Sequence, residues 1–375
     1  EDPLAGLILG VWGAAADDVY FVGGERGPTG GLLTHFDGTH ITYEAIPAGP
    51  ALWWVWGADA RHIWACGQGG RILTWRDRAW RAERTGLSET AVLWGLWGSD
   101  KDNIWAVGGS QRPGGPKGII LRSDGKGDWR PIKDGAIPTD KNLYKVWGAA
   151  ADDVHIVGEG GVALHWNGSA FRRVETPTSD LIFTVHGRSG GPILAVGGLI
   201  NGVILRWAGD RWIDDGTPER LPALNGVFVG EDGSAIATGA RGAILRRSTA
   251  GIWRLEARSI IQAFDRDTLH AVWQGDNLWA VGGDFTRLSY GSIITDRVPL
   301  PRLDPRMPMA VEDDEPPATD GGIRMDGSTP PTGDAGLPNP IEPLDGSMDG
   351  GSDATSADMV LPLDGAQVDF AERFQ

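Results

Sequence analysis

Short apolar runs, mostly of four to six residues and rich in Val, Ile, Leu and Trp, recur along the first 300 residues and are bounded by Gly, Asp and Asn. Runs of this length and composition, bounded by turn-forming residues, predict β-strands and not helices. The runs come in groups of four. The second ends in Gly, as in "IWAVGG", the third follows a Gly-rich turn, as in "RILTW", and the fourth opens on an aromatic residue, as in "AWRAE".

The first run of each group carries a marker phrase, "VWG", or a degraded form of it. Successive markers are 44, 41, 50, 39, 42 and 45 residues apart. A period in the low forties with strand-like content is typical of propeller blades. The marker residues are Trp12, Trp56, Trp97, Trp147, His186, Phe228 and Trp273.

Four strands in each of seven groups predict an all-β fold, a seven-bladed β-propeller of four-stranded blades. The marker phrase is then the innermost strand of each blade. We expect the marker Trp to pack between adjacent blades, because a blade cannot bury both of its faces alone. Closure of the seventh blade has two candidate strands: "RVPLPRL", whose prolines restrict it to an outer edge, or a segment at or before the N-terminus.

The repeat "VWG-x5-DV-x-x-VG-x-x-G-x-x-L-x-W-x-G-x-x-W" resembles the Trp-rich propellers of secreted and lipoprotein-type proteins of myxobacteria. These are related to Asp-box (BNR) propellers and to the photosystem II stability-factor type. The resemblance covers residues 7 to about 300. It implies the fold, and the same repeats serve unrelated functions. The Asp-box pattern S-x-D-x-G-x-x-W is one residue short in "SDGKGDW".

Charge divides the chain into two parts. Residues 304–375 hold 16 acids and 3 bases, a net charge of −13, whereas residues 1–303 hold 34 acids and 31 bases, a net charge of −3. A nearly neutral propeller, residues 1–303, with an acidic tail argues against nucleic-acid binding, which needs a basic surface.

The tail itself is rich in Pro, Gly, Asp and Ser. It has too few apolar residues to offset the entropy of ordering, so we expect disorder. Its "DGS" and "DGG" units lack the D-x-D-x-D-G order of a calcium loop. The last segment, residues 358–375, regains Val, Leu and Phe and is a candidate for docking onto a partner.

The single cysteine, Cys66, lies in "IWACG", where other repeats carry Val, so we interpret it as a small buried apolar residue. The sequence has no apolar run of about 18 residues that would span a membrane. It begins with Glu, which suggests that a leader or lipid-anchor segment was removed. We therefore expect an extracytoplasmic bacterial protein, in the periplasm, on the outer surface or secreted.

One candidate binding feature lies three residues before each marker, where four blades carry an aromatic residue and one carries His. If these side chains surround the mouth of the central channel, their rings could stack on sugars or on a peptide; the alternative is packing between blades. The seven positions are Leu9, Trp53, Trp94, Tyr144, Phe183, Asn225 and His270.

A second candidate feature is the length of the loops between second and third strands in blades 1, 3 and 7. Arginines converging from such loops could hold a carboxylate or sulfate, although most loop arginines are merely solvated. The loop candidates are Arg26, Arg112, Lys117, Arg287 and Tyr290, with Arg241 in a shorter loop.

No motif for catalysis or metal binding stands out, and we predict no cofactor. The seven histidines fall at unrelated positions of the repeats without H-x-x-x-H spacing, and neither a P-loop nor G-x-S-x-G occurs. Asp18, Asn103, Asp153 and Asn277 follow the marker turns, where we expect them to accept hydrogen bonds from backbone amides.

The sequence therefore favours a non-catalytic binding or scaffold propeller of the cell envelope or extracellular space that recognises a protein or glycan partner. One alternative is a lectin that uses the aromatic positions. Another is a sialidase-like glycoside hydrolase or lyase, which would need a nucleophile such as Tyr144 or Tyr290 and a pair of carboxylates in the channel.

Overall fold

The computed structural model describes residues 4–25, 29–216, 218, 221–257, 267–284, 290–299, 301–304 and 306. Within these residues the chain forms seven antiparallel blades and no α-helix; the one helical segment is a 3₁₀ turn, η1 (Glu159–Gly161). The predicted seven-bladed, four-stranded, all-β fold is confirmed. The predicted tail, residues 304–375, lies outside the described residues apart from Asp304 and Arg306. Among the described residues, no helix is long and apolar enough to cross a membrane.

Each blade runs outward from the strand that carries the marker. Blade 1 comprises β2 (Leu7–Ala15), β3 (Asp18–Gly24), β4 (Gly31–Phe36) and β5 (His40–Tyr43). Blade 2 comprises β6 (Leu52–Asp59), β7 (His62–Gly67), β8 (Ile72–Arg76) and β9 (Ala79–Glu83). Blade 3 comprises β10 (Val92–Asp100), β11 (Asn103–Gly109), β12 (Ile119–Ser123) and β13 (Trp129–Pro131).

The later blades follow the same order. Blade 4 comprises β14 (Leu143–Ala150), β15 (Asp153–Gly158), β16 (Ala163–Trp166) and β17 (Phe171–Arg173). Blade 5 comprises β18 (Ile182–Gly187), β19 (Ile193–Gly197), β20 (Val203–Trp207) and β21 (Trp212–Asp214). Blade 6 comprises β22 (Leu224–Val229), β23 (Ala235–Gly239), β24 (Ile244–Arg247) and β25 (Trp253–Ala257). Blade 7 comprises β26 (Thr268–Gln274), β27 (Leu278–Gly283), β28 (Tyr290–Thr295) and the N-terminal β1 (Leu4–Ala5).

The seventh blade is closed by the N-terminus. Strand β1 pairs antiparallel with β28, with Leu4 opposite Gly291 and Ala5 opposite Tyr290. The other candidate, "RVPLPRL", is wrong as the fourth strand of that blade. Its last residues form β29 (Arg302–Leu303), which pairs in parallel with β5 and adds a fifth strand to blade 1. The prolines precede the pairing, which begins where Arg302 supplies a backbone N–H.

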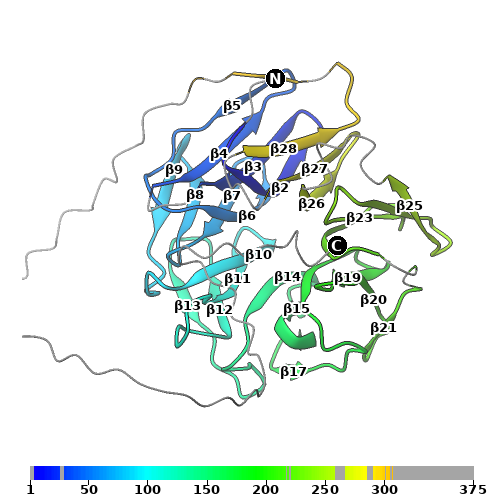
Figure 1. The fold of residues 1–375 in the computed structure, drawn as a ribbon. Helices are drawn as coiled ribbons and strands as arrows, with labels where there is room; N and C mark the ends of the chain where they lie inside the picture. Colours follow the sequence, from blue (N-terminus) through cyan, green and yellow to red (C-terminus); the bar gives the residue numbers. More distant parts are fainter. Residues whose placement is uncertain are drawn as a thin grey trace, which may run out of the picture. The chain divides into compact units, whose positions relative to one another are not determined.

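Inner strands of neighbouring blades pack against one another, and β26 of blade 7 also contacts β2 of blade 1. The seven inner strands therefore form a closed ring, with the outer strands around it (Figure 1). The buried residues between successive blades are almost all apolar, including the completely buried Trp105 and Trp279.

The glycine of the marker phrase accommodates the tryptophan of the preceding blade. A Cβ built on Gly57 would lie 2.5 Å from the Trp12 ring, and one on Gly148 would lie 2.5 Å from the Trp97 ring. The same contact joins Trp56 to Gly98, Trp147 to Gly187 and Trp273 to Gly13. The expectation that the marker Trp packs between blades is confirmed.

Where a blade lacks the marker Trp, the next blade lacks the Gly. Blade 5 carries His186, and blade 6 carries Val229 at the glycine position; the backbone N–H of Val229 donates to His186 Nδ1 at 2.9 Å. Blade 6 carries Phe228, and blade 7 carries Gln274. The marker residue of one blade and the residue at the glycine position of the next blade therefore vary together. The marker side chain occupies the space that is free where the next blade has glycine.

Candidate functional site

A β-bulge interrupts every inner strand at its second or third residue. The pairing of β6 with β7, for example, skips Trp53 between Leu52 and Trp54. A bulge inserts an unpaired residue and redirects its side chain. The skipped residues in the seven blades are Leu9, Trp53, Trp94, Tyr144, Phe183, Asn225 and His270, the same positions that the sequence selected three residues before each marker.

Five of these side chains meet inside the ring of inner strands. Ring centroids are 5.6 Å apart for Phe183 and Tyr144, 5.3 Å for Tyr144 and Trp94, 6.4 Å for Trp94 and Trp53, and 5.6 Å for Trp53 and His270. The last contact joins blade 2 to blade 7, with blade 1 between them, so these side chains point toward the axis. We call the five residues the aromatic plug.

The side chains of the aromatic plug pack against one another, so they do not form a circle of open ring faces. Trp94 is 5% exposed, and the other four members are half-buried. Most of the contacts are edge-to-face, the arrangement that aromatic rings favour, and they cover part of each ring. The indole N–H of Trp53 is buried without a hydrogen-bond partner. The plug residues therefore pack against one another across blades while four of them stay partly exposed; whether they bind a ligand stays a prediction.

Lys145 is a central residue that the sequence analysis missed. It follows the bulge in β14 and is 4% exposed. Its side chain passes blade 3, where Gly95 has no side chain, and places Nζ 3.2 Å from the ring centroid of Trp54 in blade 2. Nζ also donates to the carbonyl oxygen of Trp94 at 3.1 Å. Burial lowers the pKa of Lys145 to about 7. The signal in the sequence was a single lysine inside the apolar run "LYKVWG".

His270 is held in a defined orientation at the other end of the aromatic plug. Its Nδ1 donates to the carbonyl oxygen of Leu9, the bulge residue of blade 1, at 2.6 Å. Burial lowers the pKa of His270 to about 4, with a smaller contribution from the charge of Lys145. The imidazole is therefore neutral at pH 7.

The channel-facing positions of the inner strands carry no carboxylate. None of the seven bulge residues is acidic, and the residues that follow them are Gly10, Trp54, Gly95, Lys145, Thr184, Gly226 and Ala271. All fourteen are within the described part of the chain. The pair of carboxylates that a glycoside hydrolase needs is thus missing from these positions.

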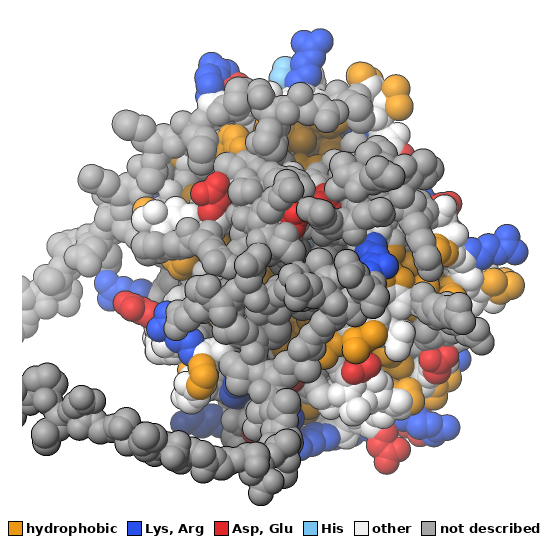
Figure 2. Space-filling model, in the orientation of Figure 1, with side chains coloured by type: hydrophobic (Ala, Val, Ile, Leu, Met, Phe, Trp, Pro, Cys, Tyr) orange, Lys and Arg blue, Asp and Glu red, His pale blue; other side chains and the backbone are white. Residues whose placement is uncertain are grey.

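The loops between second and third strands lie at the end of the blades where the inner strands begin, and they form a polar rim. Arg112 and Arg241 are exposed, and Lys117 Nζ lies 4.0 Å from Glu159 Oε2 of the next blade. The predicted residues Arg26 and Arg287 lie outside the described residues, as does the side chain of Tyr290. On the coloured part of the face in Figure 2, Lys and Arg side chains are scattered around the periphery among acids and form no single basic patch.

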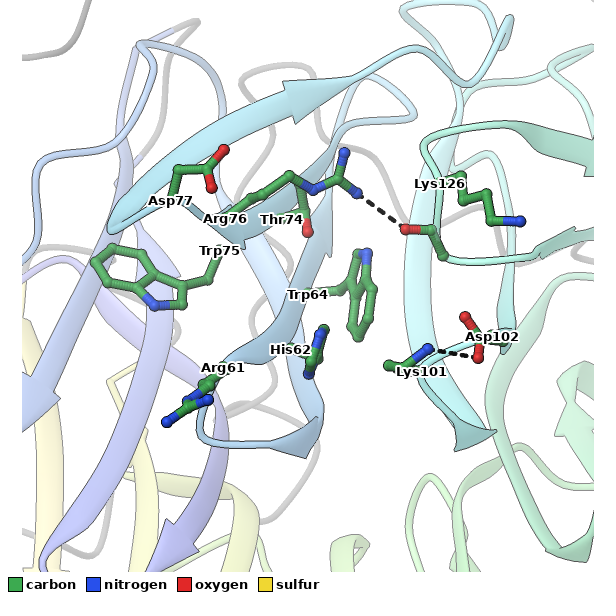
Figure 3. Close-up of a pocket in the computed structure, with 11 residues that line it drawn as sticks. Arg61, His62, Trp64, Thr74, Trp75, Arg76, Asp77, Lys101, Asp102 and Lys126 are labelled. Atoms are coloured by element: carbon green, nitrogen blue, oxygen red, sulfur yellow. Dashed lines mark hydrogen bonds and ion pairs between the residues drawn. The ribbon is translucent and has the colours of Figure 1, made fainter.

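A groove of about 450 Å³ lies on the opposite face, between blades 2 and 3. Figure 3 shows Trp64 at its centre, with cationic and anionic side chains on both sides. Arg76 donates to the carbonyl oxygen of Gly125 at 2.9 Å, and Lys101 donates to Asp102 at 2.6 Å (Figure 3). Arg76 and Lys101 already bond to other groups of the protein. We therefore consider the groove a weaker candidate for a ligand site than the channel that holds the aromatic plug.

The residues after the marker turns do not cap the turns as expected. Their side chains instead pair with the third strand: Asp18 with His35 at 2.7 Å, Asn103 with Arg122 at 2.8 Å and Asp153 with His165 at 2.8 Å. Asn277 accepts from Arg297 at 3.5 Å. The turn amides are bonded by other acids; Asp59, for example, accepts from the N–H of Arg61 at 2.8 Å. In blades 1, 3 and 4 the first residue of the second strand thus pairs across to the third strand, which the sequence pattern did not show.

The expectation that the histidines lie at unrelated positions is also wrong. His35 and His165 occupy equivalent positions in blades 1 and 4, and His155 lies directly opposite His165. Asp153, His155 and His165 place one ligand atom each within 4.8 Å of one another. Strand register decides this cluster, and the spacing along the sequence gives no sign of it.

The interpretation of Cys66 is supported. The side chain is completely buried, and Sγ lies 3.5 Å from the carbonyl oxygen of Leu93, to which it donates. Burial raises the pKa of Cys66 to about 12, so the thiol is neither ionised nor accessible.

Comparison with known proteins identifies the fold and no family. No protein-family model matches the chain, and no curated protein matches its sequence. A streptogramin B lyase structure is similar over 78% of this chain and 94% of its own, with 12% identity and a TM-score of 0.61. The WD40 β-propeller domain of Doa1 matches over 80% and 95%, with 11% identity and a TM-score of 0.55.

The GH74 xyloglucanase from Xanthomonas campestris matches over 76% of this chain and 52% of its own, with 14% identity and a TM-score of 0.56. At these identities the likeness extends to the propeller fold alone. It includes enzymes and a WD40 domain, and it supports the propeller part of the resemblance stated from the sequence, without showing a sequence family or a myxobacterial origin.

Proposed function

We propose that this protein is a non-catalytic binding module that recognises a protein partner on the loop face, with the aromatic plug as the floor of the site. The observation that carries the proposal is that all seven inner strands have a bulge at the same position relative to the marker, and that the bulge side chains of five blades form one aromatic cluster. A bulge re-aims a side chain at the expense of strand pairing, and its repetition in every blade is consistent with a use for these positions.

The composition of the face supports a protein partner. An aromatic centre surrounded by a polar rim with arginines is the usual composition of a protein–protein interface, in which buried aromatic residues contribute most of the binding energy. Arg112 and Arg241 are exposed on the rim, and Trp53, Tyr144 and Phe183 are half-buried in the floor.

A lectin is the second candidate, because aromatic rings also bind sugars. Sugar stacking needs an open ring face, and the plug residues cover part of one another's rings. A hydrolase or lyase is favoured less, since the inner-strand positions that face the channel carry no carboxylate. The location outside the cytoplasm stays a prediction from the sequence.

The experiment is a selection of random displayed peptides on the intact protein, beside a glycan array, followed by affinity measurements on two matched variants. Phe183→Ala removes the last ring of the plug, whose aromatic contact among the described residues is with Tyr144. Phe228→Ala removes a half-buried inner-strand aromatic that stacks on His186, away from the plug.

We expect selected peptides to bind the wild type and the Phe228→Ala protein and to lose at least about tenfold affinity for Phe183→Ala, the effect of losing one aromatic anchor. Thermal unfolding of both variants checks that each is folded. Selective glycan binding that depends on Phe183 would make the protein a lectin instead. Peptide binding that is equal in both variants would place the site outside the plug and contradict the proposal.

A further inference from the structure

Blade 4 contains a cluster of three potential metal ligands far from the aromatic plug. Asp153 and His155 lie on β15, and His165 lies on β16 directly opposite His155 (β15 in Figure 1). Asp153 Oδ1 is 2.8 Å from His165 Nε2 and 3.2 Å from His155 Nε2. The two rings stack with centroids 4.7 Å apart, so both Nε2 atoms approach the same carboxylate oxygen.

The other blades show which part of the cluster is ordinary. Blade 1 has the same Asp–His pair, with Asp18 Oδ1 2.7 Å from His35 Nε2, but Tyr20 stands where blade 4 has His155. That position, opposite the marker residue, is aromatic or aliphatic in the six remaining blades: Tyr20, Trp64, Trp105, Leu194, Ile236 and Trp279. The repeat therefore does not require a histidine there, and His155 needs an explanation of its own.

Packing alone leaves His155 poorly satisfied. The residue is 0% exposed, its Nδ1 has no hydrogen-bond partner, and its Nε2 lies 3.2 Å from Asp153 Oδ1 without the geometry of a hydrogen bond. Its neighbours across the blade junction are Trp207 and Trp212, with centroids 4.8 and 5.7 Å away. A buried polar atom without a partner is destabilising, by about 1–3 kcal/mol in typical proteins, and native structures contain few of them. A metal cation bound between the three ligand atoms would give Nε2 of His155 a bonding partner.

The donor set and its spacing fit a transition metal. Two imidazoles and one carboxylate are ligands that Zn²⁺ accepts, with metal–ligand distances of about 2.0–2.2 Å. In a tetrahedral site such bonds separate neighbouring ligand atoms by about 3.3 Å. The two separations that involve Asp153 Oδ1, 2.8 and 3.2 Å, are close to this value, and all three ligand atoms lie within 4.8 Å of one another. Asp153 is 40% exposed, which leaves one side of the cluster open to solvent for entry of the ion.

From these observations we propose that Asp153, His155 and His165 form a binding site for one divalent transition-metal ion, with Zn²⁺ as the best-fitting ion. Arg172, whose charge acts on His155, lies over the Trp207 ring at 5.6 Å and donates to the carbonyl oxygen of Asp210, so its guanidinium is already engaged. The site lies at the end of the blade where the marker turn lies, opposite the loop rim.

The test is titration of the intact, metal-free protein with ZnCl₂ in competition with a chromogenic chelator. The matched variant is His155→Tyr, which gives blade 4 the residue that blade 1 carries at this position and is therefore expected to fold. We expect one tightly bound ion for each wild-type chain and at least a hundredfold weaker binding in His155→Tyr. X-ray absorption of the zinc complex should show two nitrogen neighbours at about 2.0–2.1 Å.

The converse variant, Tyr20→His, adds the missing imidazole to the Asp18–His35 pair, and a second bound ion in that protein would support the same argument. Zinc binding of equal affinity and stoichiometry in the wild type and His155→Tyr would place the ion elsewhere, for example on exposed carboxylates, and overturn the proposal. Failure of the wild type to bind Zn²⁺ at micromolar concentration would also overturn it. Circular dichroism of each variant confirms that the comparison is between folded proteins.

Discussion

The indole of Trp273, in the last blade, lies against Gly13 in the first, so that a Cβ at Gly13 would be 2.6 Å from two ring atoms. The same contact joins four other neighbouring pairs of blades, and here it joins residues 260 positions apart, as 273 minus 13. Closure of the propeller thus uses the contact that stabilises its other junctions.

We predict that Gly13→Ala destabilises the protein by about 1–3 kcal/mol, the usual cost of forcing an extra carbon into a packed interface. Gly135→Ala is the control, since a Cβ there has no atom within 4 Å, and should change stability by no more than about 0.5 kcal/mol. Urea unfolding of both variants measures the difference. Equal stabilities would show that the Trp273 ring can move aside without loss.

The His186–Val229 junction should be convertible to the Trp–Gly type. His186→Trp alone places an indole against the Val229 side chain and should destabilise the protein, whereas the double variant His186→Trp/Val229→Gly should recover much of the loss. We expect a coupling of about 0.5–3 kcal/mol between the two substitutions, the range seen for residues in contact. A double-mutant cycle of unfolding free energies measures it, and purely additive effects would contradict the prediction.

The same residue predicts an acid sensitivity. Burial lowers the pKa of His186 to about 4, and its Nδ1 accepts a hydrogen bond from the N–H of Val229, which requires the unprotonated nitrogen. The unfolded chain takes up the proton near pH 6.5 and the folded protein only near pH 4, so stability is complete above pH 6.5 and falls as the pH is lowered toward 4.

The loss attributable to His186 has an upper limit of about 3.5 kcal/mol, since one pKa unit corresponds to about 1.4 kcal/mol. The His186→Trp/Val229→Gly protein should lose less stability than the wild type between pH 6.5 and pH 4.5, as measured by urea unfolding at each pH. His270, with a similarly lowered pKa, remains in both proteins and contributes equally.

Lys145 predicts a further rise of stability with pH on the alkaline side. Its pKa is lowered from 10.5 to about 7 in the folded protein, so between these values the unfolded chain binds more protons. Stability should therefore rise with pH from about 7 upward, by at most about 1.4 kcal/mol for each pH unit. In Lys145→Met this rise should be reduced between pH 7 and pH 9. An identical pH dependence in both proteins would mean that Lys145 remains charged in the channel.

The N-terminal strand should contribute to stability despite its length. Deletion of residues 1–5 removes β1 and leaves the backbone groups of β28 without a partner on that edge. We expect a loss of about 1–3 kcal/mol, corresponding to a few backbone hydrogen bonds. Deletion of residues 307–375, which the sequence predicts to be disordered, is the control and should leave the unfolding transition unchanged.

The blade architecture could be read from the sequence because the signal is local. Each strand is a short apolar run, and the marker phrase repeats often enough to fix the number of blades. The positions of the bulge residues could also be selected, since they stand at a constant distance from the marker. The direction in which their side chains point could not be predicted, because a bulge is a property of strand pairing. The contact between Trp53 of blade 2 and His270 of blade 7 also depends on the closed ring, since blade 1 lies between them.

Other features depended on register between strands that the sequence does not specify. His155 and His165 are opposite one another only because β15 and β16 pair in that register. Lys145 reaches Trp54 over Gly95 from two blades away, a contact that needs the geometry of the closed ring. The sequence offers two candidates for the fourth strand of blade 7. The strand is β1, which pairs with β28 from the opposite end of the propeller sequence.

Strand β1 is joined to β28 through two residue pairs, whereas the other end of the propeller is joined to β5 through β29. A pulling force applied to the two chain ends would therefore act first on these short pairings and on the Trp273–Gly13 contact, before it reached any complete blade. These pairings and the Trp273–Gly13 contact are the contacts near the chain ends that hold the ring closed. Tension that broke these contacts would separate blade 7 from blade 1 and expose the inner strands of both.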